Sequence, residues 1–290
     1  MSDYAIVTDS SCDLTAKMAD ELELTVLPLA FNLAEKEYRN YLDGREMSFK
    51  DFYKHIRDGE SCTTSAVNME AFASAFERIL QSGRDVLCIA FSSGLSNTYN
   101  AAKLAAEEVA PKYPERKVLV VDSLCASLGQ GLLIYHAAQE KRSGKSIDEV
   151  FGWLEENKLH LCHWFTVEDL NHLKRGGRIS AATALIGTML NIKPVLHVDD
   201  EGHLINVGKA RGRRASLSAL VDHMVETAVS PSSQVVFISH GDSQADADFV
   251  ADEVKKRLGV KTVVTNYVGP VIGTHSGPGT IALFFLGTHR

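Results

Sequence analysis

The chain has 290 residues, of which 45% are apolar and 23% are charged, and its formal net charge is −7. This composition is typical of a folded protein and excludes a disordered chain, and the negative charge argues against a protein that coats nucleic acid. Apolar runs such as 281–286 are too short to span a membrane, and Asp3 stands where a signal peptide would carry positive charge, so we expect a soluble cytoplasmic protein.

In the first half of the chain, apolar runs of strand length alternate with longer helical patterns. The strand patterns lie at 4–8, 24–29, 86–91 and 118–121, and a variable loop follows the second of them. Helical patterns lie at 69–80, 97–109 and 128–140. This alternation predicts a parallel sheet with helices on both faces, which is a three-layer α/β/α arrangement.

The pattern changes after a polar stretch at 141–145. Ser146 and Glu149 form a predicted capping box, which begins a helix that ends at about Asn157. We place the boundary between two domains there. The predicted N-terminal domain, 1–157, is Rossmann-like, and the predicted C-terminal domain, 158–290, is a two-layer α/β domain with a mixed sheet.

The second half contains six predicted strands and four predicted helices. The strands at 194–198 and 204–209 are joined by the turn 199–202 and read as a β-hairpin. The remaining predicted strands lie at 159–167, 235–239, 262–266 and 280–286, and the predicted helices lie at 171–174, 181–190, 217–228 and 246–258.

Three polar segments could hold a ligand. The stretch 91–99 runs from a strand through Ser96 and Asn97 into a helix, where free N–H groups and the helix dipole favour an anion. The hydroxyl cluster at 62–66 precedes another helical pattern, and the Gly- and Pro-rich loop at 269–279 contains His275. Each has a plainer interpretation: Ser96 and the cluster as helix caps, and the loop as a hairpin connection with a solvated histidine.

Two basic segments, 174–178 and 209–214, have arginines on glycine-flanked turns. Arginine in this setting suits a phosphate or a carboxylate-rich partner, but it is equally typical of solvated surface.

Several stronger motifs are absent from the sequence. It has neither a P-loop nor a G-x-G-x-x-G motif, and the five cysteines include no Cys-x-x-Cys pair. His160 and His163 point to opposite faces of a predicted strand, which argues against a zinc site. We therefore expect no cofactor and no metal.

An enzymatic alternative remains open. Ser96, Asp122 and His275 occur in the chain order of the α/β-hydrolase triad, and the segment around Ser96 is close to the G-x-S-x-G elbow. Thr98 replaces the second glycine of that elbow and would crowd its strained turn.

Seven separate motifs, taken in the order in which they occur along the chain, resemble those of the DegV family of bacterial fatty-acid-binding proteins. The resemblance runs from end to end. The motifs are 6–14, Thr64-Ser65, 92–99, Val121-Asp122-Ser123, 173–180, Ile192-Lys193-Pro194 and 273–279. The resemblance implies two α/β domains with a long-chain fatty acid buried between them. It also implies a binding subunit with no catalytic residues of its own, which presents the fatty acid to a separate kinase for ATP-dependent phosphorylation to an acyl phosphate used in phospholipid synthesis.

Carried over motif by motif, the resemblance assigns the carboxylate ligands to Thr64, Ser96 and His275, with Ser65, Ser93 and Asn97 nearby. It assigns Arg178 and Arg211 to contact with the kinase or the phosphate.

The apolar tail needs a wall, for which we consider Phe31 and the predicted helix 181–190, with Leu185, Ile186, Met189 and Leu190. Ala66-Val67 and Asn97 depart from the family pattern, so chain length and unsaturation stay open. A regulatory lipid sensor without a kinase is a third possibility.

Overall fold

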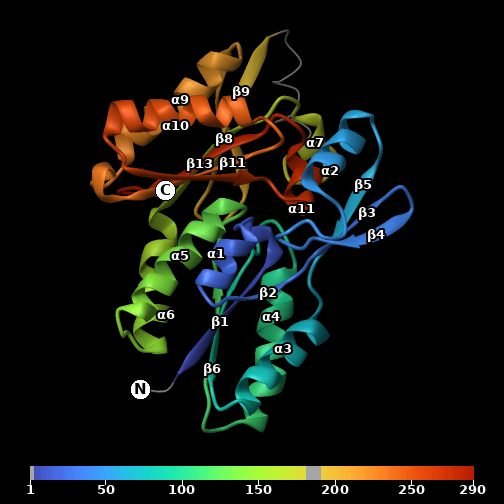
Figure 1. Ribbon diagram of the computed structural model, residues 1–290, viewed down its shortest axis with the longest axis vertical. Coiled ribbons are helices and arrows are strands. Elements are labelled where there is room, and N and C mark those ends of the chain that lie inside the picture. The colour runs from blue at the N-terminus through green and yellow to red at the C-terminus, as the bar shows by residue number, and fades with distance from the viewer. Residues whose placement is uncertain (1–2, 181–190) are drawn as a thin grey trace.

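The computed structural model describes residues 3–180 and 191–290, and its first sheet is the predicted parallel one. The sheet has the order β2-β1-β6-β7, and all of its neighbouring strands are parallel. Figure 1 shows it in the lower half of the molecule. Its strands are β1 (Tyr4–Asp9), β2 (Thr25–Leu27), β6 (Asp85–Ala90) and β7 (Val118–Asp122).

Helices cover both faces of this sheet, as predicted. Alternate residues of each strand point to opposite faces, so Val7 and Cys88 pack with one pair of helices and Ile6 and Ile89 with the other. The first pair is α3 (Met69–Gln81) and α4 (Thr98–Val109); the second is α5 (Leu128–Arg142) and α6 (Ile147–Asn157), and α1 (Ala16–Glu21) is a further short helix. The capping box of Ser146 and Glu149 at the start of α6 is present.

The segment between β2 and α3 corrects the expectation of a variable loop. It forms a small antiparallel sheet of order β4-β3-β5, covered by α2 (Phe49–Arg57). Phe31 packs there against Phe52 and Tyr53, so it does not belong to a tail-binding wall. The strands are β3 (Ala30–Leu33), β4 (Lys36–Arg39) and β5 (Cys62–Ser65).

The second large sheet is mixed, as predicted. Its order is β10-β9-β8-β13-β11-β12, and β11 and β12 are its only parallel pair among the described residues. The predicted hairpin is β9 and β10. The bounds are β8 (Leu161–Thr166), β9 (Ile192–Val198), β10 (Leu204–Arg211), β11 (Val235–His240), β12 (Thr262–Tyr267) and β13 (Ile281–Leu286).

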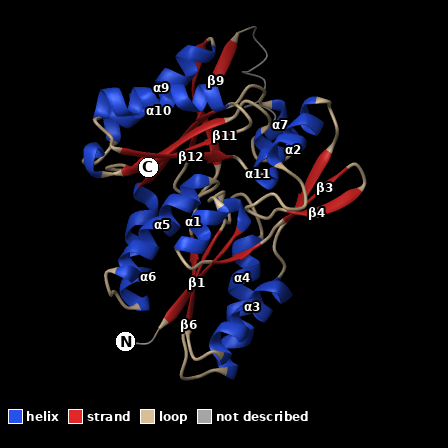
Figure 2. Ribbon diagram, in the orientation of Figure 1, coloured by secondary structure: helices blue, strands red, loops and turns tan. Residues whose placement is uncertain are grey.

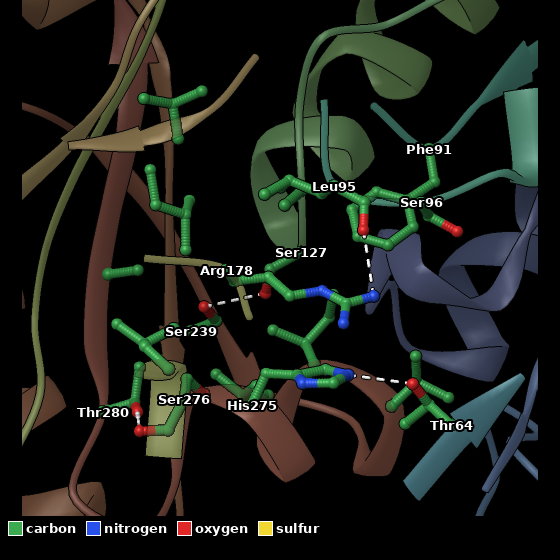
Figure 3. A pocket seen from close by; sticks show the side chains of 18 of the residues that line it. Thr64, Phe91, Leu95, Ser96, Ser127, Arg178, Ser239, His275, Ser276 and Thr280 are labelled. Atoms are coloured by element: carbon green, nitrogen blue, oxygen red, sulfur yellow. Dashed lines mark hydrogen bonds between the residues drawn. The ribbon is translucent and has the colours of Figure 1, made fainter. Parts of the chain in front are cut away.

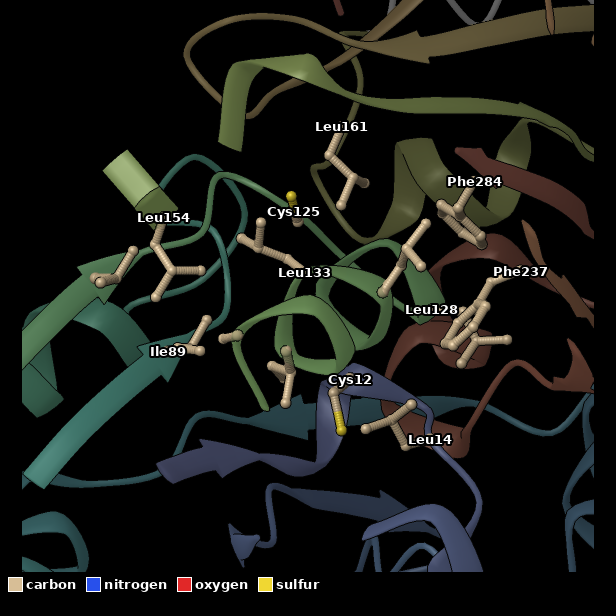
Figure 4. Packing of buried hydrophobic residues seen from close by; sticks show 14 of the residues in the cluster. Cys12, Leu14, Ile89, Cys125, Leu128, Leu133, Leu154, Leu161, Phe237 and Phe284 are labelled. Carbon is tan, nitrogen blue, oxygen red and sulfur yellow. The ribbon is translucent and has the colours of Figure 1, made fainter. Parts of the chain in front are cut away.

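The two faces of this sheet have different neighbours. Helices α9 (Arg213–Thr227) and α10 (Gln244–Leu258) cover one face, where Val236, Ile238 and Leu283 are buried. The other face turns toward the first half of the chain. Figure 2 shows the sheet with α9 and α10 above it and α5 and α1 below it. On that side Phe237 and Phe284 join a core that also contains residues of α5 (Figure 4).

Two short helices complete the description, and one of them corrects a prediction. The helix α7 (Asn171–Arg175) matches the predicted one, whereas α11 (Pro270–Ser276) occupies a segment expected to be a loop. Proline is favoured in the first turn of a helix, because its missing N–H would have no partner there. The helix predicted at 181–190, with the apolar wall assigned to it, lies outside the described residues.

Candidate functional site

A cavity of about 170 Å³ lies between the two halves of the fold. One wall is the inner face of the mixed sheet, where the period of two places Phe165, Ala282 and Phe284 side by side on adjacent strands. Loops and short helices of both halves form the rest. The apolar lining is Leu29, Ala66, Phe91, Leu95, Ala126, Phe165, Leu173, Val198, Leu204, Val268, Val271, Ile272, Ala282 and Phe284.

Thr64 and His275 meet at the polar end of this cavity. Thr64 Oγ1 lies 2.8 Å from His275 Nε2, although 211 positions separate the two residues. Strand β5 alternates, so Thr64 is half-buried while Thr63 and Ser65 are exposed. The hydroxyl cluster at 62–66 is therefore a strand and not a cap; Asn68 caps α3 by accepting a hydrogen bond from the N–H of Ala71.

Helix α11 fixes the position of His275. The Tyr53 hydroxyl donates a hydrogen bond of 2.7 Å to the carbonyl of Val268, just before the helix. A Cβ atom on Gly273 would lie 2.6 Å from that same hydroxyl oxygen, so only glycine lets α11 approach so closely. His275 is also in tight contact with α7, because a Cβ atom on Gly176 would lie 2.1 Å from His275 Nδ1.

Ser96 lines the cavity just before α4 begins. Its Oγ accepts a hydrogen bond of 3.2 Å from the backbone N–H of Thr98 and lies 2.9 Å from the Thr98 hydroxyl. The prediction of Ser96 as the N-cap is wrong: the N-cap of α4 is Asn97, whose side chain makes no capping hydrogen bond, and Ser96 lies one residue before it in the cavity wall. Asn97 and Ser65 also line the cavity, and both are exposed at its edge.

Arg178 places a positive charge at the same end. Its guanidinium donates a hydrogen bond of 3.0 Å to the carbonyl of Leu95, and another to the carbonyl of Gly176. Within 3–180 and 191–290, no carboxylate forms an ion pair with it, although it is half-buried. Burial lowers the pKa of Arg178 below its ordinary value. Figure 3 shows the guanidinium between Ser96 on one side and His275 and Thr64 on the other.

The charge balance at this end favours an anion. Burial, with the charge of Arg178 as a second cause, lowers the pKa of His275 to about 4, so the imidazole is neutral at pH 7. Arg178 then has carbonyl partners but no counter-charge among the described residues, and a half-buried charge without a counter-charge is unfavourable. A carboxylate would supply that partner, with the hydroxyls and the imidazole as additional hydrogen-bonding groups.

A second pocket of about 420 Å³ adjoins the first and is mainly polar. Thr64, Arg178 and His275 line both, so these three residues stand between an apolar interior and a polar pocket. Arg175 and His172 of α7 contribute to the polar pocket, and their side chains lie 2.9 Å apart.

Two residues predicted for the site lie away from the cavity. Ser93 is exposed and is not part of the lining; its backbone N–H donates to Asp122 Oδ1. Arg211, at the end of β10, is exposed and lines neither pocket. Arg178 was expected to contact the kinase or the phosphate, and its place in the cavity wall was missed. The clue available from the sequence was its closeness to the Gly176-Gly177 pair, which permits tight approach.

The hydrolase triad is not assembled. The imidazole of His275 binds Thr64, the hydroxyl of Ser96 binds Thr98, and the carboxylate of Asp122 accepts from the N–H groups of Ser93 and Leu124. With these partners, no described carboxylate orients His275 and His275 does not reach Ser96 as a base.

Among the described residues, one group could supply three ligand atoms to a metal ion. It consists of Asp199, Glu201 and His203 on the β9–β10 turn. Asp199 Oδ1 already accepts hydrogen bonds from the backbone N–H groups of the other two, which is an ordinary turn arrangement. Within residues 3–180 and 191–290, no helix is long and apolar enough to cross a membrane.

The family model for DegV proteins matches residues 3–288. A DegV domain-containing protein of Clostridium perfringens is 46% identical over 99% of this chain and 98% of its own length. A DegV family protein of Thermus thermophilus, whose structure is described as showing fatty acid binding, has a TM-score of 0.88 and 32% identity over 99% of this chain and 100% of its own.

A second, more distant structure shares the fold alone, at 19% identity. It is the Fatty Acid Kinase B3 protein of Streptococcus pneumoniae, loaded with linoleic acid, with a TM-score of 0.83 over 98% of this chain and 99% of its own. The match of the family model over nearly the whole length, and the identity to the clostridial relative, agree with the motifs found in the sequence. This chain belongs to the DegV family.

Proposed function

We propose that this protein binds a long-chain fatty acid, with the tail in the apolar cavity and the carboxylate at its polar end. The observation that carries the proposal is the guanidinium of Arg178, which has no ion-pair partner among the described residues, at one end of a mainly apolar cavity. A long apolar chain that ends in one negative charge matches both features. The fatty acid binding of the Thermus thermophilus relative supports the same ligand class.

In this proposal the carboxylate replaces the contact between Thr64 Oγ1 and His275 Nε2, and it accepts hydrogen bonds from the hydroxyls of Thr64 and Ser96 and from the imidazole N–H of His275. Arg178 supplies the charge. Ser65 and Asn97 are placed at the edge of the cavity, where they can contact the ligand head, whereas Ser93 has no role.

The proposed role is that of a carrier subunit, not of an enzyme acting alone. A partner kinase would transfer the γ-phosphoryl group of ATP to a carboxylate oxygen, which gives an acyl phosphate and ADP. The polar pocket beside Thr64, Arg178 and His275 gives access to the carboxylate from outside the apolar cavity. The kinase partner comes from the resemblance to the DegV family.

Thr64→Val tests the carboxylate site, because it keeps the shape of the side chain and removes the hydroxyl. A hydrogen bond to a charged group contributes about 1.5–3 kcal/mol, so we expect fatty-acid affinity to fall by at least tenfold, measured by isothermal titration with octadecanoate. Ser93→Ala is the matched control, since it removes an exposed hydroxyl outside the cavity. Equal affinities of Thr64→Val and Ser93→Ala would contradict the assignment of Thr64.

Arg211→Ala tests the presentation to a kinase. Arg211 is exposed and outside the cavity, so we expect octadecanoate to bind as in the unmodified protein while transfer of phosphate from ATP by the kinase of the same organism decreases. Equal loss of binding and transfer would mean that Arg211 supports the lipid cavity instead. If no kinase of the host phosphorylates the bound lipid on the unmodified protein, the carrier role is wrong and a lipid sensor replaces it.

A further inference from the structure

The cavity contains a second set of polar atoms besides the carboxylate site. Ser127, Ser239 and Ser276 all line it, and their exposed fractions are 5%, 0% and 5%. They come from the start of α5, from β11 and from the end of α11. In Figure 3 they are drawn well apart from Thr64 and Ser96. Beside an apolar chain, the hydrogen-bonding capacity that Ser239 and Ser276 do not use within the protein would have no partner.

The hydroxyl of Ser239 can donate one hydrogen bond and accept others, and its contact with Ser127 uses only one of these two capacities. Ser127 Oγ lies 2.5 Å from Asp13 Oδ2 and 3.0 Å from Ser239 Oγ. With Asp13 ionised, protons run from Ser239 to Ser127 to Asp13, and the lone pairs of Ser239 are left over. With Asp13 protonated the order reverses, and the proton of Ser239 is left over. Burial raises the pKa of Asp13 to about 8, so both states occur near neutrality.

Ser276 has a similar surplus. Its Oγ is buried and has no hydrogen-bond partner among the described residues. Its own carbonyl is satisfied by the hydroxyl of Thr280, 3.1 Å away, so only the side chain lacks a partner. Buried hydroxyls are nearly always hydrogen-bonded in folded proteins, which points to a group that enters the cavity with the ligand.

The strained backbone of Ser127 indicates that its side chain has a function in this cluster. Its φ of 54° and ψ of −145° are rarely adopted by residues other than glycine. The fold therefore keeps a side chain at a position where glycine would be less strained. That side chain is the link between Asp13 and Ser239.

We propose that the preferred ligand is a fatty acid with a hydroxyl group on its chain, and that this hydroxyl binds Ser239 and Ser276. A hydroxyl both donates and accepts, so it satisfies Ser239 in either protonation state of Asp13 and Ser276 at the same time. The described cluster has no cation, which excludes a second carboxylate as its ligand. This inference rests on the proposed binding of a fatty acid.

The test compares octadecanoic acid with its monohydroxy derivatives, substituted at successive positions along the chain, by competitive titration of the full-length protein. We expect one position to bind about 2- to 10-fold more tightly than the unsubstituted acid. The double variant Ser239→Ala, Ser276→Ala should reverse that preference, because the ligand hydroxyl would then be buried without a partner. Ser276→Ala alone should reduce it.

Thr166→Val is the matched control. Thr166 also has a buried hydroxyl that finds no partner in the described part of the chain, but it does not line the cavity, so its loss should leave the preference unchanged. If every hydroxylated acid binds no better than octadecanoic acid, the cluster serves a bound water and the inference is wrong. If octadecanoic acid and all derivatives fail to bind, the proposed function itself fails, and melting temperatures show whether the variants are folded.

Discussion

His275 stands where the apolar cavity meets the polar pocket, and its charge state determines what the site can hold. A neutral imidazole can give and take hydrogen bonds with Thr64 and with a ligand, and it leaves Arg178 as the charge of the site. Because burial keeps the imidazole neutral, the folded protein resists protonation of His275 until the pH falls to about 4.

This has a consequence for stability. The pKa of an unfolded histidine is about 6.5, so the unfolded chain binds a proton between pH 6.5 and pH 4 that the folded chain does not bind. The free energy of unfolding therefore decreases as the pH falls through this window. His275→Gln should remove this part of the decrease, which is on the order of 1 kcal/mol between pH 7 and pH 5, in urea titrations. Parallel pH profiles of the two proteins would contradict the buried neutral imidazole.

The residues of the site could be located from the sequence, but their hydrogen-bond partners could not. Thr64, Ser96 and His275 were each found in polar segments that also had a plain structural interpretation. Ser96 has a structural role of its own, since it accepts a hydrogen bond from the N–H of Thr98 at the start of α4, although the N-cap is Asn97. The contact of Thr64 with His275 joins positions 211 apart and depends on the packing of α11, which local patterns do not contain.

Three short elements, β5, α7 and α11, bring the polar end of the cavity together. The strand supplies Thr64, α11 supplies His275, and α7 ends at the glycine pair before Arg178. Their approach depends on Gly176, where a side chain would collide with the imidazole.

Gly176→Ala tests this arrangement. The φ of Gly176 is −73°, so alanine fits the backbone, and the expected defect is a displaced imidazole that weakens octadecanoate binding by about tenfold or more. Gly177→Ala is the adjacent control: its φ of 71° makes alanine strained by about 1 kcal/mol, but a Cβ atom there meets nothing within 4 Å. It should lower the melting temperature and retain binding. Stronger loss of binding in Gly177→Ala would reverse the roles given to the two glycines.

Long, periodic elements were predictable, whereas several short ones were not. The parallel strands, the hairpin of β9 and β10 and the helices α3 to α6 follow from apolar periodicity. Strands β3, β4 and β5 have four residues each, too few to show a period, and they are stabilised by one another. Helix α11 was missed because Pro270 and Gly273 resemble a loop, while in the fold one begins the helix and the other admits Tyr53.

At the scale of the whole molecule, the cavity is a consequence of how the two sheets meet. The turn after β6 touches the β9–β10 turn so closely that a Cβ atom on Gly94 would lie 2.7 Å from the carbonyl oxygen of Glu201. Arg290 adds hydrogen bonds to the carbonyls of Leu124 and Asp199. The alternation of strands and helices predicted both sheets, whereas the boundary at 157 stays a prediction.

The most direct test of fatty-acid binding is mass spectrometry of the purified protein, first under native conditions and then denatured, with analysis of the released lipid. The proposal predicts a bound fatty acid at close to one equivalent, lost on denaturation and replaceable by added octadecanoic acid. The released molecule would also identify chain length and any hydroxyl group. A protein that is empty as purified and does not bind added fatty acids would contradict the account.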